Sequence, residues 1–172
     1  MKYLEGLNQL VRRLRQYRTE NEWASAILDS ASQFGQQIAL FSFQDGNLRL
    51  RGQRGLNLPG SLSLNIASAA AFQSAISSRD SVIALRTAPE VGESLCSPDP
   101  SARAYIIPIE NGSRVVALLF VAGKPIELNA IDLIAGVASM ALEREANRTL
   151  HTQIAAQSNR KKLGAEYPRK LA

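Results

Sequence analysis

The chain has few of the residues that catalytic and metal sites require. It contains one cysteine, Cys96, and one histidine, His151. A single cysteine cannot form an internal disulfide or a cysteine-based metal cluster, and His151 has no cysteine or carboxylate pair at metal-ligand spacing. The phosphate-binding patterns GxxxxGK[ST] and GxGxxG do not occur. We therefore predict no catalytic residues, no metal, no cofactor and no enzymatic activity.

The sequence also lacks a long apolar run. No stretch approaches the roughly 18 consecutive apolar residues that a membrane span requires, and residues 1–18 interrupt every apolar run with Glu, Arg or Gln. The chain has 172 residues, of which 45% are apolar and 20% charged, which is typical of one domain with its own core. We expect a cytoplasmic protein that does not contact the membrane.

Positive charge is concentrated at the two ends of the chain. The formal charge is +5, with five Lys/Arg against three Asp/Glu in residues 1–22, eight against nine in 23–142, and seven against three in 143–172. A nearly neutral middle argues against a nucleic-acid groove in the folded body, although the basic ends leave a weak, salt-sensitive contact open. Solvated helix faces account for the same charges.

Asn111-Gly112 is the strongest hairpin signal and separates two apolar runs within residues 103–124. An Asn-Gly pair supplies the positive φ angles of a two-residue turn, so Tyr105 should face Leu118 across the hairpin. Both faces of this hairpin are mostly apolar. We therefore expect it to lie inside a sheet that is covered on both sides.

A second two-residue turn, Asp45-Gly46, lies within residues 37–55. Its register places Phe41 opposite Leu50. Charged side chains protect an exposed sheet edge from pairing with another sheet, and the second strand carries two arginines on one face. These are Arg49 and Arg51. We interpret this strand as an edge strand.

Helical periodicity and capping residues predict four helices, over residues 3–17, 22–34, 63–80 and 129–157. Residues 81–87 are expected to form a strand. Residues 88–102 contain three prolines and no periodicity, and a loop this long is more often functional, as a lid or pocket wall, than accidental. This order of elements predicts an α+β fold around an antiparallel sheet of about five to six strands.

Both terminal helices carry apolar stripes that a single chain would leave in water. The stripe of the first helix is narrow, which suits packing against another helix, and the stripe of the last helix continues past the end of the sheet. We therefore predict a homodimer formed by a parallel or crossed bundle of terminal helices. The predicted contacts are Leu4, Leu7, Val11, Leu14, Leu142 and Leu150.

Two segments resemble the GAF domain family. The hairpin ARAYIIPIENGSRVVALLFVAGK resembles the family's order of small residue, apolar residue, Pro, turn and apolar run. The segment ELNAIDLIAGVASMALERE resembles the closing helix of the family, with Asp132 and Leu133 in the matching places. The resemblance covers roughly residues 22–147. The resemblance implies that the terminal helices lie on one face of the sheet, often as a dimeric bundle. It also implies a small-molecule pocket on the other face, under a helix and a long loop.

On this resemblance we predict that the pocket lies on the hairpin face with the larger apolar groups. Its residues are Phe41, Phe43, Arg103, Tyr105, Ile107 and Leu118. Ordinary core packing would give the same pattern. Some relatives attach a tetrapyrrole through a cysteine followed by histidine, whereas Cys96 is followed by Ser97, and methionine sulfoxide reduction needs a second cysteine. The dispersed residue set of the cyclic-nucleotide relatives cannot be traced.

We divide the chain into an N-terminal helix (1–21), a GAF-like domain ending in a long helix (22–157) and a basic tail (158–172). The expected function is a cytoplasmic sensor or signal-transduction module that binds a small ligand, dimerises and acts on a downstream signalling protein. The alternative is a dimerisation or protein-interaction module that binds no ligand. A cavity of roughly 300 Å³ or more beside Tyr105 would favour sensing, and a filled core would favour the alternative.

Overall fold

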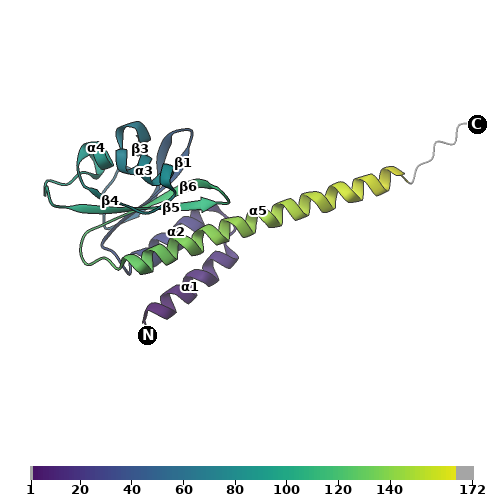
Figure 1. Ribbon diagram of the computed structural model, residues 1–172. Helices are drawn as coiled ribbons and strands as arrows, with labels where there is room; N and C mark the ends of the chain where they lie inside the picture. Colours follow the sequence, from purple (N-terminus) through teal and green to yellow (C-terminus); the bar gives the residue numbers. More distant parts are fainter. Residues whose placement is uncertain (1, 166–172) are drawn as a thin grey trace, which may run out of the picture.

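The computed structural model describes residues 2–165, which form a six-stranded antiparallel sheet with helices on both faces (Figure 1). The strand order is β3-β2-β1-β6-β5-β4. The strands are β1 (Gln37–Gln44), β2 (Asn47–Arg54), β3 (Ser63–Asn65), β4 (Val82–Leu85), β5 (Arg103–Asn111) and β6 (Arg114–Ala122). The helices are α1 (Lys2–Gln16), α2 (Glu20–Ala31), α3 (Ala70–Ser78), α4 (Ala88–Val91) and α5 (Leu128–Ala165), with short 3-10 turns η1 (Ile66–Ser68) and η2 (Glu93–Leu95). The predicted α+β architecture is confirmed.

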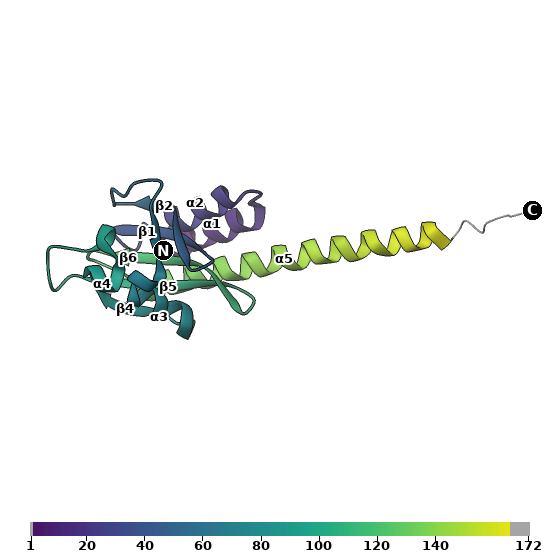
Figure 2. The ribbon, with the colours of Figure 1, turned by 90° about the horizontal axis from the view of Figure 1, so that it is seen from above.

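Each face of the sheet has its own hydrophobic cluster. The helical face is covered by α1, α2 and the first part of α5, and the opposite face, which we call the α3 face, is covered by α3 and α4 (Figures 1 and 2). The central strands β1 and β6 contribute to both clusters, which is why their sequences are almost continuously apolar. The prediction of terminal helices on one face and a helix on the other is confirmed.

The β1–β2 hairpin has the predicted register. Asp45 and Gly46 have φ angles of 51° and 75°, the left-handed values of a two-residue hairpin turn, and Phe41 pairs with Leu50. The edge-strand interpretation of β2 is wrong, however. Strand β3 pairs with β2 along its outer edge, because residues 63–65, predicted as the start of a helix, are extended. The Asn65 side chain then caps the 3-10 turn that follows.

The predicted register of the β5–β6 hairpin is wrong. Asn111 pairs with Arg114, so the turn is one residue further along, at Gly112-Ser113. A bulge then leaves Val116 without a partner, because Glu110 pairs with Val115 while Ile109 pairs with Ala117. A bulge inserts one residue and reverses the faces of everything beyond it. Consequently Tyr105 pairs with Val121, not with Leu118.

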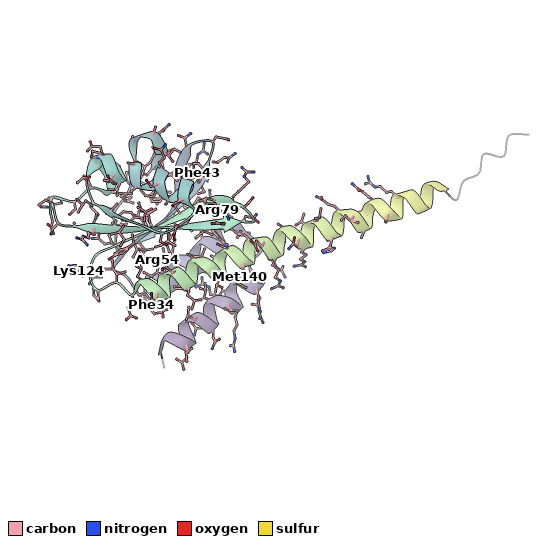
Figure 3. All side chains as sticks on the ribbon, viewed as in Figure 1. Phe34, Phe43, Arg54, Arg79, Lys124 and Met140 are labelled. Atoms are coloured by element: carbon pink, nitrogen blue, oxygen red, sulfur yellow. The ribbon has the colours of Figure 1, made fainter. Side chains whose placement is uncertain are left out.

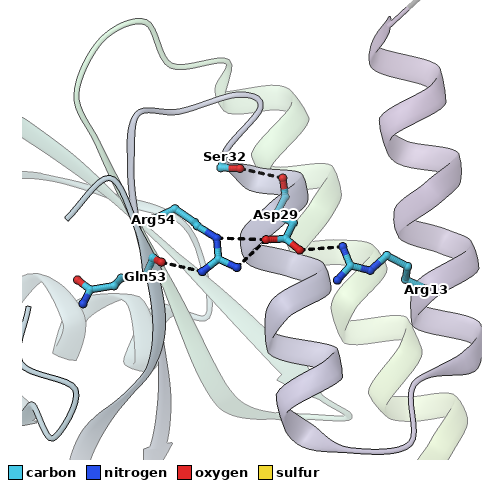
Figure 4. A network of polar contacts seen from close by, with 5 residues as sticks. All are labelled: Arg13, Asp29, Ser32, Gln53 and Arg54. Carbon is cyan, nitrogen blue, oxygen red and sulfur yellow. Dashed lines mark hydrogen bonds and ion pairs between the residues drawn. The ribbon is translucent and has the colours of Figure 1, made fainter. Parts of the chain in front are cut away.

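Asp29 on α2 joins three elements (Figure 4). Its carboxylate oxygens accept hydrogen bonds from Arg54 Nη2 on β2 at 2.6 Å and from Arg13 Nη1 on α1 at 3.0 Å. Burial acts to raise the pKa of this carboxyl, but the hydrogen bonds and charges of the two arginines outweigh it and lower the pKa. Since the Asp29 side chain is 42% exposed, we expect the network to contribute about 1 kcal/mol or less. Its role is to hold the α1–α2 pair against the sheet.

The last helix is longer than predicted. α5 continues to Ala165 and so includes the start of the predicted tail, while residues 166–172 lie outside the described residues. Every described side chain of α5 beyond Leu142 is exposed, and the helix projects past the sheet (Figures 1 and 2). Residues 88–102, predicted to be a loop, contain α4 and η2. Among residues 2–165, no helix is long and apolar enough to cross a membrane.

Candidate functional site

The six predicted pocket residues do not share a face. Phe41, Phe43 and Leu118 belong to the cluster of the α3 face, whereas Tyr105 and Ile107 belong to the cluster of the helical face. The β5 alternation assigns Arg103 to the side of Tyr105, and this arginine is exposed at the start of the strand. The grouping of these residues into one site is therefore wrong, and the bulge at Val116 is the physical reason.

On the α3 face, the place where we expected a pocket is filled by Phe72 of α3. Its side chain is fully buried, with its ring centroid 5.7 Å from that of Phe41 and 6.4 Å from that of Phe120. Arg86 closes one end of this group, with its guanidinium carbon 5.6 Å from the centre of the Phe120 ring. Aromatic groups in edge-to-face and stacked contact leave little room for a ligand.

Arg86 also forms hydrogen bonds with the segment predicted to be a lid or pocket wall. Its Nε donates to Leu95 O at 3.0 Å, its Nη1 donates to Gln37 Oε1 at 2.7 Å, and Ser97 N donates to Arg86 O at 2.8 Å. Burial lowers the pKa of the Arg86 guanidinium. These contacts, together with the burial of Val91 and Leu95, hold this part of the segment against the α3 face, and its role as a lid or pocket wall stays a prediction.

A cleft of about 290 Å³ opens on the helical face instead. It lies where the connection between α1 and α2 meets the sheet and α5. Apolar groups form most of its surface. The lining residues are Tyr17, Arg18, Thr19, Glu20, Trp23, Ala24, Ser42, Arg51, Asn111, Val116, Ala117 and Leu142. Tyr105, where a cavity of this size was expected, is not among them.

Two β-bulges shape the floor of this cleft. Arg51 has no partner on β1, because Leu40 pairs with Gly52 and Phe41 pairs with Leu50. Val116 is the unpaired residue of the β5–β6 bulge, and both unpaired residues line the cleft. Bulges redirect side chains and are frequent beside functional sites. The bulge at Val116 has no signal in the sequence pattern, whereas Gly52 within β2 was an available sign of the bulge beside it at Arg51.

The charged groups of the cleft are two arginines and one glutamate. Arg51 Nη2 lies 2.7 Å from Glu20 Oε2. The Arg18 backbone N–H donates to Glu22 Oε2 at 2.7 Å, while its guanidinium makes no hydrogen bond or ion pair with any described residue. The Trp23 side chain is 5% exposed, and its indole nitrogen is buried without a hydrogen-bond partner in the described part of the chain. Burial, followed by the charge of Glu145, raises the pKa of Tyr17 at the cleft wall.

The predicted dimer residues have different environments. Leu14 is buried within its own chain, and Leu7 and Leu142 pack against the same cluster. Val11 is half-buried, while Leu4 and Leu150 are exposed. The seam of α1 therefore packs largely against α2 and α5 of the same chain, which the sequence could not distinguish from packing against a second chain.

A different apolar seam lies on the outside of α5. It consists of Leu133, Met140, Leu150 and Ile154, each between 51% and 68% exposed, and Figure 3 shows the position of Met140. At 3.6 residues per turn these four residues fall within about 100° of the helix surface, opposite the buried side of α5. Glu143 and Asn147 interrupt the seam. The sequence prediction included Leu150 of this seam together with Leu142 of the inner stripe, but it did not separate the two sides of the helix and it missed Leu133 and Met140.

The chain matches no protein-family model and no curated protein sequence. Solved structures do match it. The GAF domain of A. aeolicus nlh2 in an inactive state aligns with a TM-score of 0.66 at 11% identity, over 84% of this chain and 97% of that chain. The GAF domain of a phosphoenolpyruvate-protein phosphotransferase from Coxiella burnetii aligns with a TM-score of 0.63 at 16% identity, over 87% and 96%.

The chain has a GAF-like fold. An enzyme shares it: a free methionine-R-sulfoxide reductase from Neisseria meningitidis, solved with its substrate, aligns with this GAF-like domain at a TM-score of 0.60 and 13% identity, over 84% of this chain and 91% of that chain. Identities this low establish the fold and do not transfer an activity. In the present domain Cys96 is exposed, and its thiol donates to Glu93 O at 2.9 Å.

Proposed function

We propose that this GAF-like domain is a signal-transduction module that dimerises through the outer seam of α5. The single observation behind the proposal is that every described side chain of α5 beyond Leu142 is exposed, although Leu150 and Ile154 of this seam lie there. A helical segment without tertiary contacts is only marginally stable, because most helix stability in proteins comes from packing an apolar face. A parallel partner helix supplies that packing and gives a symmetric dimer.

The polar positions in the seam define its expected strength. Asn147 and Glu143 occupy positions between the apolar residues, and polar residues there specify register at a cost in stability. We therefore expect a dimer that forms at micromolar concentration and dissociates on dilution. The signal passes along α5 to a downstream protein. A cytoplasmic location and the lack of catalysis stay predictions.

Small-molecule sensing is the second candidate function, and the cleft on the helical face favours it. The α3 face does not, because a ligand there must displace Phe72 from between Phe41 and Phe120. A module that only dimerises remains the alternative if the cleft binds nothing.

Cysteine cross-linking tests the dimer. In a Cys96→Ser background, Ile154→Cys places a thiol in the seam, and Thr149→Cys places a matched thiol on the opposite side of the same exposed segment. A disulfide requires the two β-carbons to lie about 4 Å apart, so in a parallel dimer only Ile154→Cys should cross-link efficiently under mild oxidation. Equal cross-linking of the two variants would contradict the seam.

Sedimentation provides an independent measurement. The wild-type chain should dimerise with increasing concentration, and Leu150→Asp with Ile154→Asp should keep it monomeric without lowering its helix content below that of the wild-type monomer. Both side chains are exposed, so the substitutions leave the folded core intact. A wild-type chain that stays monomeric at high micromolar concentration would reject the proposal.

A further inference from the structure

We propose that the cleft between Tyr17, Trp23, Val116 and Leu142 binds a small carboxylate with an aromatic or aliphatic body. The proposal develops the sensing function above by naming the site and the ligand class. It does not depend on dimerisation, because every lining residue comes from one chain.

The size and surface of the cleft define the body of the ligand. Its volume of about 290 Å³ is at the lower end of the range for small-molecule pockets. Trp23, Val116 and Leu142 provide apolar walls, and Ala24 and Ala117 leave the space between them open. A single aromatic ring with a short side chain, or an aliphatic chain of similar volume, fits these walls.

The charges of the lining residues define the polar end of the ligand. Arg18 and Arg51 carry positive charge and Glu20 is the one carboxylate of the lining, which leaves a net charge of +1. Glu20 is paired with Arg51, so Arg18 is the cation free to bind a ligand anion. Hydrogen bonds between a guanidinium and a carboxylate are stronger than those between neutral groups. A carboxylate on the ligand therefore suits the charges of this cleft better than an amine or a hydroxyl group.

Trp23 gives a second, independent indication of a ligand. Its buried indole N–H has no acceptor within the described residues, and Trp23 is one of the residues that line the cleft. A buried donor without an acceptor is costly and unusual in folded proteins. A carboxylate oxygen that reached this nitrogen would satisfy it. The bulges that direct Arg51 and Val116 into the cleft support the same conclusion, since they cost two ladder pairings.

The single tryptophan of the chain is the natural reporter, since Trp23 lies in the cleft wall. We would titrate the full-length chain with phenylacetate, benzoate and hexanoate, and record tryptophan emission together with the melting temperature. At least one acid should change the emission saturably and raise the melting temperature by mass action. Phenylacetamide, which has the same body without the charge, should bind about tenfold more weakly than phenylacetate.

Three variants locate the binding. Arg18→Gln should weaken phenylacetate binding about tenfold, whereas Arg15→Gln, an exposed arginine of α1 outside the cleft, should leave it unchanged. Val116→Phe should fill the cleft and abolish binding while the melting curve stays cooperative. Because Arg18 is exposed, its substitution tests the proposal even if Val116→Phe folds poorly.

Several results would overturn the proposal. One is the absence of any change in emission or melting temperature with all three acids at about 10 mM, a concentration far above the dissociation constant expected of a specific site. Others are equal effects of Arg18→Gln and Arg15→Gln, unchanged binding in Val116→Phe, or equal affinity for the acid and its amide. A change of Trp23 emission with protein concentration alone would show that a second chain covers the cleft. The cross-linking of α5 is independent of all these results.

Discussion

The substitution Phe72→Ala tests whether the α3 face is filled in solution. Phe72 is fully buried, and truncating a buried phenylalanine costs about 3–5 kcal/mol through lost transfer energy and the cavity left behind. The loss of unfolding free energy should lie in the upper half of that range, because the ring also packs against Phe41 and Phe120, with ring centroids 5.7 Å and 6.4 Å away. Aromatic pairs add about 0.5–1.5 kcal/mol each. For a chain of this length we expect the melting temperature to fall by roughly 8–20 °C.

Urea unfolding followed by circular dichroism measures the effect, and the slope m should stay unchanged while the midpoint falls. Ile83→Ala on β4 is the control, since Ile83 is 57% exposed and should lose less than about 1 kcal/mol. A loss of under about 1 kcal/mol for Phe72→Ala would refute the reasoning. It would mean that Phe72 does not fill the α3 face in solution, and a ligand pocket there would again be the better interpretation.

Two further predictions concern the acid stability and the turns of the fold. Asp29 has a lowered pKa, so its contribution to stability is fully present above its unfolded pKa of about 3.9 and is lost as the pH falls through the lower folded pKa. Asp29→Asn should cost about 1 kcal/mol or less at pH 7, and the urea midpoints of the two proteins should begin to approach each other below about pH 4 and meet below the folded pKa. Gly55 and Gly112 have φ angles of 67° and 62°, but an added Cβ would lie 1.9 Å from Gln36 O at Gly55 and meets nothing within 4 Å at Gly112. Gly112→Ala should cost about 1 kcal/mol and Gly55→Ala about 1–3 kcal/mol more, measured by the same unfolding assay.

The order of elements could be predicted from the sequence because local signals carry it. Asp45-Gly46 fixed the register of the first hairpin, since both residues tolerate positive φ and no bulge lies between the turn and Phe41. The short strand β3 was missed because three extended residues before an Asn cap resemble the start of a helix. The resemblance to the GAF family correctly indicated the layers.

The position of the site could not be predicted, because it depends on a bulge. The Asn-Gly pair was correctly recognised as a hairpin signal, but the turn lies one residue later and Val116 is inserted without a partner. Moving the turn by one residue leaves each side chain on its predicted face of the sheet. The single inserted residue moves the side chains of one strand beyond it to the other face relative to its partner. Tyr105 and Ile107 therefore lie on the helical face, and the residues chosen for one pocket are divided between two clusters.

The two proposed sites meet at one place on α5. Leu142 lines the cleft with its inner side chain, and the seam residue Met140 lies two positions earlier on the opposite side of the helix. Beyond Leu142 every described side chain of the helix is exposed. A ligand in the cleft adds packing at the last supported turn, and a partner helix adds packing to the outer side of the same turn. Since two binding events that stabilise one segment influence each other equally, the cleft and the seam are placed to be coupled through α5.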